Sequence, residues 1–263
     1  MSQLIHELHE LACVVAREAG ALLASRVDEH HLAISSKSSP TDMVSEVDRE
    51  SEELIVSRIL AARPGDAILG EEGGSRPGTS GVRWVIDPLD GTTNYLYRLP
   101  AYAVSIAAEH EGRVVAGAVF DAAHSDLYAA RLGGGATWNG ASIVTSAKAE
   151  LATALIGTGF GYEAQQRGEQ GTVLARVLPY VRDIRRYGSA ALDLCGVACG
   201  RLDGYFELGL GPWDWAAGAL IVREAGGLTG LIERDGRIVR VIASSRPLFE
   251  PLRVLLEEAG APR

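Results

Sequence analysis

The segment "WVIDPLDGTTNY", residues 84–95, takes the chain from an apolar strand directly into a pair of acids. Trp84 to Ile86 are typical of a buried β-strand, and Asp87 and Asp90 follow at once, three residues apart. An unpaired carboxylate in an apolar interior costs several kcal/mol, so two of them at a strand exit need a neutralising partner. The segment therefore predicts a sheet with a charged site at the end of this strand.

The composition is that of a compact enzyme-sized protein. The chain has 263 residues, of which 47% are hydrophobic and 31 are glycine, which favours a large core with many tight turns. The net charge of −9 disfavours direct binding of nucleic acid. No uncharged apolar run is long enough to span a bilayer, and the first ten residues lack a signal pattern, so we expect a cytoplasmic protein with no membrane contact. Three cysteines predict no disulfide framework.

Helical and strand patterns alternate along the whole chain. Apolar periodicity predicts helices at 3–27, from Thr41 or Asp42 to about residue 62, at about 169–181, from Ser189 onward, and from Trp213 or Asp214 to Glu224. Strands are predicted at 66–70, 84–86, in an antiparallel meander over 103–131, at 152–157, and in "DIRRY" (183–187) and "GYFEL" (204–208). Residues 133–140 are predicted to be a loop with an Asn-Gly turn.

This mixture predicts an α/β (α+β) fold in one unit. No linker or repeat interrupts the chain, so layered packing of two halves is the simplest organisation. We place an N-terminal α+β half at about 1–145 and a C-terminal α/β half at about 146–263.

Four carboxylates occur at strand ends or helix starts: Glu71, Asp87, Asp90 and Asp214. Two carboxylates about 4 Å apart repel by roughly 4 kcal/mol at an effective dielectric of 20. A divalent cation would remove this repulsion. None of the six histidines lies in or beside these segments, and an oxygen-only ligand set points to Mg²⁺, Mn²⁺ or Ca²⁺.

The spacing of Asp87-Pro88-Leu89-Asp90 supports a metal site. Pro88 fixes φ and turns the chain, so both carboxylates and the Leu89 carbonyl can converge on adjacent ions. Gly91-Thr92 brings the backbone close, and a short helix starting there would direct free N–H groups at the same point. A single Asp in this segment is more often part of a turn. The combination with "GEE" (70–72) and "PWDWAAG" (212–218) favours a cation and phosphate site.

Together these segments resemble the inositol monophosphatase family of Mg²⁺-dependent, lithium-sensitive phosphatases. The resemblance spans almost the whole chain and rests on "WVIDPLDGTTNY" (84–95), "WDWAAGALIVREAGG" (213–227), "GEE" (70–72), "KSSPTDMVSEVD" (37–48) and "RRYGSAALDLCGVACGRLDGYFELGLGPWD" (185–214). It implies an αβαβα layered sandwich, a homodimer, and hydrolysis of myo-inositol monophosphate to inositol and phosphate by a metal-activated water.

The resemblance also implies roles for individual residues. Ligands of a first Mg²⁺ would be Glu71, Asp87 and the Leu89 carbonyl, and ligands of a second Asp87, Asp90 and Asp214. A third, weaker ion near Glu71 is also implied, and Mn²⁺ is a possible substitute. Residues that act on the attacking water would be Thr92, Asp48, Glu71 and Glu72. Lys37 matches a position on a mobile loop.

Substrate contacts follow from the same resemblance. Phosphate oxygens would meet the N–H groups of Gly91 and Thr92, beside Asp90 and Asp214. Inositol hydroxyls would meet Gly188, Ser189, Ala190 and Glu207, and a carboxylate at a strand end is well suited to accept hydrogen bonds from a polyol. Gly73 departs from the Ser or Thr expected after "GEE".

Two other functions are compatible with the sequence. Relatives that act on histidinol phosphate, fructose 1,6-bisphosphate or 3′-phosphoadenosine 5′-phosphate share the metal site, and the shape of the pocket is not visible in a sequence. A role as a non-catalytic partner of the transcription machinery is the second, with Arg182, Arg185 and Arg186 as a docking stripe.

Overall fold

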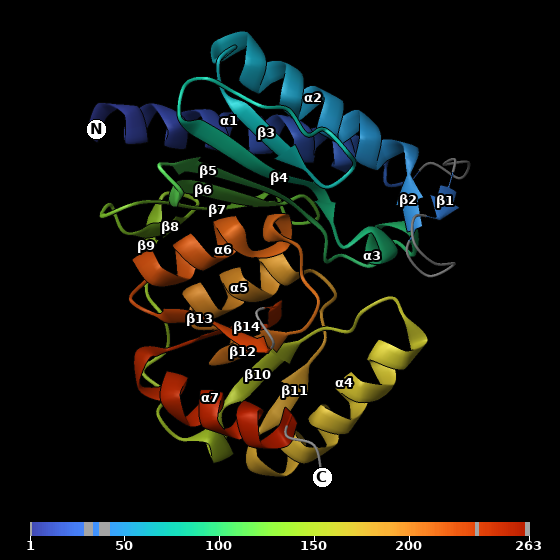
Figure 1. Ribbon diagram of the computed structural model, residues 1–263, viewed down its shortest axis with the longest axis vertical. Coiled ribbons are helices and arrows are strands. Elements are labelled where there is room, and N and C mark those ends of the chain that lie inside the picture. The colour runs from blue at the N-terminus through green and yellow to red at the C-terminus, as the bar shows by residue number, and fades with distance from the viewer. Residues whose placement is uncertain (1, 29–33, 37–42, 235–236, 261–263) are drawn as a thin grey trace.

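The computed structural model describes residues 2–28, 34–36, 43–234 and 237–260, and it arranges them in five layers. Figure 1 shows two β-sheets that alternate with three layers of helices. The αβαβα sandwich predicted from the resemblance is confirmed. Its division into halves near residue 145 stays a prediction.

The first outer layer consists of α1 (Ser2–Arg26) and α2 (Glu46–Ala62). The buried side of α1 includes Leu8, Val15 and Leu23, which recur at helical spacing. This side packs on the first sheet together with Ile55 and Ile59 of α2. The predicted helix at 3–27 is confirmed.

The first sheet has seven strands in chain order: β3 (Ala67–Gly70), β4 (Val82–Asp90), β5 (Ala103–His110), β6 (Arg113–Asp121), β7 (Asp126–Arg131), β8 (Ala136–Trp138) and β9 (Ala141–Ile143). β3 is parallel to β4, and all later pairs are antiparallel. Side chains of β4 alternate, so Trp84 and Ile86 belong to the core under α1 and α2 while Val85 belongs to the core on the opposite face.

The middle layer, α5 (Ala190–Ala198) and α6 (Pro212–Glu224), is buried between the two sheets. Small residues let α6 approach the first sheet closely. A Cβ at Gly117 of β6 would lie 3.1 Å from the Cα of Ala217. The start of α6 at Pro212 agrees with the preference for proline in the first helical turn.

The second sheet has the strand order β11 (Asp183–Arg185), β10 (Leu155–Thr158), β12 (Gly204–Glu207), β14 (Arg237–Ser244) and β13 (Leu228–Arg234). β10 is parallel to both β11 and β12, and the other pairs are antiparallel. The last layer, α4 (Ala164–Val177) and α7 (Arg246–Gly260), covers its outer face through a third core that includes Ile156, Phe206 and Leu252.

Several element predictions need correction. The second helix begins at Glu46, because residues 43–45 form β2 (Met43–Ser45), which pairs with β1 (Ile34–Ser36). Thr41, Asp42 and Lys37 lie outside the described residues. The helix predicted at 169–181 spans 164–177, and a 3₁₀ turn over Leu178–Tyr180 follows it. Pro179 in that turn has no N–H for a helical hydrogen bond.

The segment 133–140 contains more structure than a loop. Asn139 and Gly140 have φ of 50° and 81° and form the predicted Asn-Gly turn, but they join two strands, β8 and β9. The hairpin of β13 and β14 and the helix α7 were not predicted. Among the described residues, no helix has both the length and the apolar content needed to cross a bilayer.

Candidate active site

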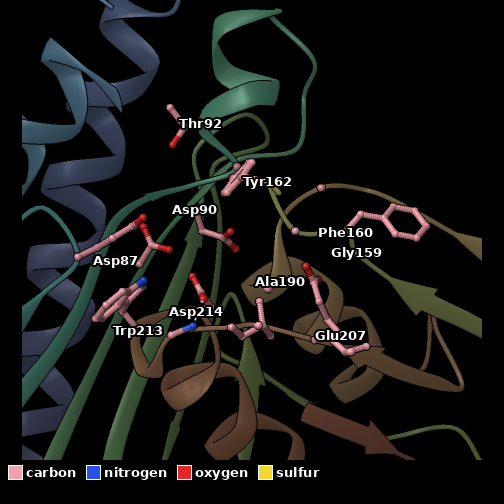
Figure 2. Close-up of a pocket in the computed structure, with 18 of the residues that line it drawn as sticks. Asp87, Asp90, Thr92, Gly159, Phe160, Tyr162, Ala190, Glu207, Trp213 and Asp214 are labelled. Carbon is pink, nitrogen blue, oxygen red and sulfur yellow. Dashed lines mark hydrogen bonds between the residues drawn. The ribbon is translucent and has the colours of Figure 1, made fainter. Parts of the chain in front are cut away.

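A pocket of about 380 Å³ opens where the two sheets and the middle helices meet. Its walls come from β4, from α3 (Thr92–Leu96), from the segment after β10, and from the N-terminal ends of α5 and α6. Figure 2 shows the side chains of Asp87, Asp90 and Asp214 near one another in this pocket. The volume is sufficient for a small ligand.

The end of β4 is irregular, and this places both of its acids in the pocket. The register with β5 shifts between Asp87 and Asp90. The Leu89 N–H donates to Asp87 Oδ1 at 3.0 Å, and Ser51 Oγ of α2 donates to the Pro88 carbonyl at 2.8 Å. A bulge of this kind redirects side chains that would otherwise alternate between the faces of a sheet.

Three carboxylates meet at this bulge. Glu71, which follows β3, Asp87 of β4 and Asp214 of α6 each offer an oxygen, and these oxygens all lie within 4.8 Å of one another. Asp214 is fixed by the Gly211 N–H, which donates to its Oδ2 at 2.6 Å. The predicted convergence of these segments, which are distant in sequence, is present in the structure.

The surroundings disfavour the charged forms of these acids. Burial raises the pKa of Asp87 well above its usual value, and the charges of Glu71, Asp90 and Asp214 raise it further. Burial likewise raises the pKa of Asp214, with Asp90 and Glu71 as the next causes. Four carboxylates without a compensating cation are therefore unfavourable, and their all-oxygen donor set fits a hard divalent ion.

Asp90 is held toward the middle helices. Its Oδ2 accepts hydrogen bonds from Ser189 Oγ at 2.6 Å and from the Ala191 N–H at 2.7 Å. Burial raises its pKa to about 6, and these two hydrogen bonds oppose that increase because they favour the charged form. Asp90 thus connects the first sheet to the N-terminus of α5.

Thr92 lies at the start of α3, next to the bulge. Its Oγ1 is 3.0 Å from Asp48 Oδ1 of α2 and 3.1 Å from the Leu89 carbonyl oxygen. Gly91 precedes the helix with φ of 95°, and a Cβ there would lie 2.8 Å from the Ala101 carbonyl oxygen. Glycine at this position satisfies both the backbone conformation and the close contact.

The opposite wall contains Glu207, at the end of β12. Tyr205 donates a hydrogen bond to Glu207 Oε2 at 2.5 Å. Burial raises the pKa of Glu207 to about 7, while the Tyr205 hydrogen bond acts in the opposite direction. A Cβ at Gly159 would lie 2.0 Å from Glu207 Oε2, so this carboxylate occupies the space that a larger residue would fill.

Most of the predicted site residues are brought together. The pocket is lined by Glu71, Asp87, Leu89, Asp90, Gly91, Thr92, Gly188, Ala190, Glu207 and Asp214. Asp48 and Ser189 contact the site through Thr92 and Asp90. Among the described residues, Glu72 is not one of those that line the pocket. Lys37 lies outside the described part of the chain.

Two residues near the site were not predicted as parts of it. Glu52 of α2 accepts hydrogen bonds from the N–H groups of Glu72 at 2.9 Å and Gly74 at 2.8 Å. It lies four residues after Asp48, so an acid on the same side of a helix as Asp48 was a signal that could have identified it. Arg186 lines the pocket, whereas Arg182 and Arg185 bind the Thr153 carbonyl and Asp183. No sequence signal distinguished Arg186 from its neighbours.

Clustered carboxylates that need a cation, next to the start of a short helix, fit the class of metal-assisted phosphatases. The comparisons agree: a model described as "Inositol monophosphatase family" matches residues 4–260. The chain belongs to the inositol monophosphatase family.

Curated relatives and solved structures support this assignment over most of the chain. "Inositol-1-monophosphatase SuhB" of Mycobacterium tuberculosis is 50% identical over 257 residues, covering 94% of this chain and 89% of the relative. "Nus factor SuhB" of Escherichia coli is 42% identical over 226 residues, covering 85% of each chain. The structure of extragenic suppressor protein suhB from Bartonella henselae superposes with a TM-score of 0.85 at 39% identity, covering 93% of this chain and 95% of that one.

Proposed function

We propose that the protein is a Mg²⁺-dependent phosphatase that hydrolyses myo-inositol monophosphate to inositol and phosphate. The observation that carries this proposal is the meeting of Glu71, Asp87 and Asp214 within one pocket, where they need a cation. The name of the M. tuberculosis relative supports the choice of substrate.

We propose that these oxygen ligands hold two or three Mg²⁺ ions. Glu71, Asp87 and the Leu89 carbonyl would hold one, and Asp87, Asp90 and Asp214 would hold another, with a third near Glu71. Bound Mg²⁺ would supply Lewis acidity toward water and toward the phosphate and ester oxygens. Mn²⁺ has similar ligand preferences and is expected to substitute for it.

Thr92 and Asp48 would orient the attacking water. If the Thr92 hydroxyl donates its single proton to Asp48, at 3.0 Å, its lone pairs remain available to accept a hydrogen bond from water. Water held in this way would be aligned for attack on phosphorus, which is the positioning component of catalysis. Glu72 could take part only through an intervening water, since the described pocket lining does not include it.

Backbone and side-chain groups on the remaining walls would bind the substrate. The N–H groups of Gly91 and Thr92 would meet phosphate oxygens, since the start of a helix favours anions. Glu207 would accept hydrogen bonds from inositol hydroxyls beside Gly188, Ser189 and Ala190. Gly188 has φ of 92°, which brings the backbone itself to the pocket.

The replacement Asp90→Asn tests this proposal. It should keep the fold, because Asn still accepts hydrogen bonds from Ser189 and Ala191, but it removes a charge that a cation needs. We expect metal affinity and turnover to fall by orders of magnitude, measured as phosphate release during Mg²⁺ titration. Equal rates for wild type and variant at limiting Mg²⁺ would refute the site.

A substrate panel separates the proposed activity from its rivals. Phosphate release from inositol monophosphate should exceed that from histidinol phosphate, fructose 1,6-bisphosphate and 3′-phosphoadenosine 5′-phosphate. Lithium should inhibit the reaction, a prediction that rests on family resemblance. The homodimer stays a proposal of the same kind, tested by the mass of the protein in solution.

A second function is supported by one comparison. The E. coli relative is named a Nus factor, which favours association with the transcription machinery as a further role. Co-purification with RNA polymerase that is unchanged in Asp90→Asn would establish a role independent of catalysis. If neither wild type nor variant co-purifies with RNA polymerase, this second function is excluded.

A further inference from the structure

Three parallel strands of the second sheet end on the same side of the pocket. β10 lies between β11 and β12 and is parallel to both, so their carboxyl ends meet at one edge of the sheet. Arg186 follows β11, Gly159 follows β10 and Glu207 ends β12, and all three line the pocket. We call these three residues the second-sheet edge. Ligands commonly bind at such edges in α/β sheets.

The second-sheet edge is distinct from the wall that carries the metal-binding carboxylates. Glu71, Asp87 and Asp90 come from β3, β4 and the residues after them, and Asp214 comes from α6. If cations and phosphate occupy that wall, the alcohol part of the substrate faces the second-sheet edge. Polyol hydroxyls both donate and accept hydrogen bonds, and an anionic carboxylate such as Glu207 can only accept them.

Arg186 can supply the missing donors. It is the one basic side chain among the described residues that line the pocket, and a guanidinium offers five N–H donors in a planar fork. Within the described part of the chain, no hydrogen bond or ion pair engages this guanidinium. None of the described residues therefore competes with a ligand for the hydrogen bonds of this guanidinium.

Gly188 leaves space for the guanidinium of Arg186 beside the pocket. A Cβ built on Gly188 would lie 2.3 Å from Arg186 Nη1 and 2.8 Å from Asn94 Nδ2. Since φ of Gly188 is also positive, a larger residue there would be strained and would displace Arg186. The glycine thus leaves space for the Arg186 guanidinium beside the backbone at the pocket.

The charge of Arg186 also acts on Glu207. Burial raises the pKa of Glu207 to about 7, and Arg186 is among the groups that lower it. The guanidinium therefore helps Glu207 to remain an ionised acceptor near neutral pH. Arg186 and Glu207 thus offer hydrogen-bond donors and acceptors of opposite charge in one pocket.

We propose that Arg186 is a substrate-binding residue that donates hydrogen bonds to hydroxyl groups of the polyol phosphate while Glu207 accepts them. This rests on the proposed function and assigns the recognition of the alcohol to a residue that does not touch the reacting phosphorus. The substrate class is a phosphomonoester with adjacent hydroxyl groups.

The test compares two substrates in the intact Mg²⁺-loaded enzyme. For Arg186→Ala with inositol monophosphate, we expect KM to rise about tenfold with kcat within about twofold, which corresponds to about 1.4 kcal/mol. With p-nitrophenyl phosphate, which has no polyol, KM and kcat of this variant should stay within about twofold of the wild-type values. Arg186→Lys keeps the charge without the planar fork. Its KM for inositol monophosphate should lie between those of wild type and Arg186→Ala.

Arg182→Ala is the matched control, because it removes an exposed arginine of the same segment that does not line the pocket. In this control, KM and kcat for both substrates should match those of wild type. Equal loss on both substrates with Arg186→Ala would assign Arg186 to the phosphate and overturn the proposal, as would unchanged kinetics. Wild-type enzyme that hydrolyses neither substrate with Mg²⁺ would instead overturn the proposed function.

Discussion

At the scale of single residues, the Thr92 hydroxyl is a polar group whose position is fixed by two neighbours. It is buried and lies within hydrogen-bonding distance of both Asp48 Oδ1 and the Leu89 carbonyl oxygen. One proton cannot serve both acceptors fully, and donation to Asp48 is favoured because charged acceptors form stronger hydrogen bonds. The remaining lone pairs then define where a water can donate.

Replacing Thr92 tests this placement. Thr92→Ala should lower kcat by about 10²-fold or more, as expected when a group that positions the nucleophile is removed. Thr92→Ser keeps the hydroxyl and should retain most of the activity. Phosphate release at saturating Mg²⁺ measures both variants, and similar rates for Ala and Ser would show that the hydroxyl has no such role.

The sequence pointed to the acidic residues that meet in the pocket, because they interrupt local patterns. Asp87 and Asp90 follow an apolar strand, and Asp214 starts a helix, so their chemistry is visible without tertiary structure. Arg186 shows the limit of such inference. Its place at the pocket depends on β11 pairing in parallel with β10, a contact between residues 155–157 and 183–185 that no local pattern reveals.

At the scale of elements, the turn after β3 is held by a side chain from α2. Both carboxylate oxygens of Glu52 accept backbone N–H groups, from Glu72 at 2.9 Å and Gly74 at 2.8 Å. A Cβ at Gly70 or Gly74 would lie 2.4 or 2.6 Å from these oxygens. The side chain of Glu52 thus fixes the turn that carries Glu71, and Gly73, where Ser or Thr was expected, lies within this turn.

The replacement Glu52→Gln should loosen this turn. A glutamine amide has only one acceptor oxygen, so one partly buried N–H loses its partner, which costs at most about 1–3 kcal/mol. We expect the Mg²⁺ concentration for half-maximal activity to rise severalfold, with smaller changes in kcat at saturating Mg²⁺. Glu53→Gln, an exposed neighbour on the same helix, is the control and should match wild type. An unchanged Mg²⁺ requirement in Glu52→Gln would separate this turn from the metal site.

Element boundaries were predicted least well where pairing overrides local preference. Val44 fits the apolar stripe of a helix, yet residues 43–45 pair with 34–36 as a short hairpin. Residues 136–138 and 141–143 were assigned to a loop because such short strands have little periodicity, and the long ladder of the first sheet supplies their partners.

At the scale of the whole molecule, the site connects both halves of the sandwich. Asp87 and Asp90 come from the first sheet, Asp214 from the middle layer and Glu207 from the second sheet. Burying these acids together works against folding unless a cation binds. Metal binding and stability of the fold are therefore linked, because an ion that binds the folded state stabilises it.

This linkage predicts how stability depends on pH. In the folded, metal-free protein the pKa of Asp90 is raised to about 6 and that of Glu207 to about 7. A raised pKa means that the folded state binds protons more tightly than the unfolded state. The contribution to stability is therefore fully present below the unfolded pKa values of about 4 and is lost as the pH rises through 6 and 7. Where the folded pKa exceeds the unfolded pKa by one, this contribution is about 1.4 kcal/mol.

With a chelator present, the Tm of the protein should therefore fall by several degrees between pH 5 and pH 8. Glu207→Gln, which cannot ionise at this position, should show a smaller fall than wild type. Added Mg²⁺ should raise the Tm more at pH 8 than at pH 5, since protonated carboxylates are poor metal ligands. Thermal unfolding at both pH values, with chelator and with Mg²⁺, measures all of these differences. A Mg²⁺-induced rise in Tm of equal size at both pH values would mean that the ion binds elsewhere than at these buried acids.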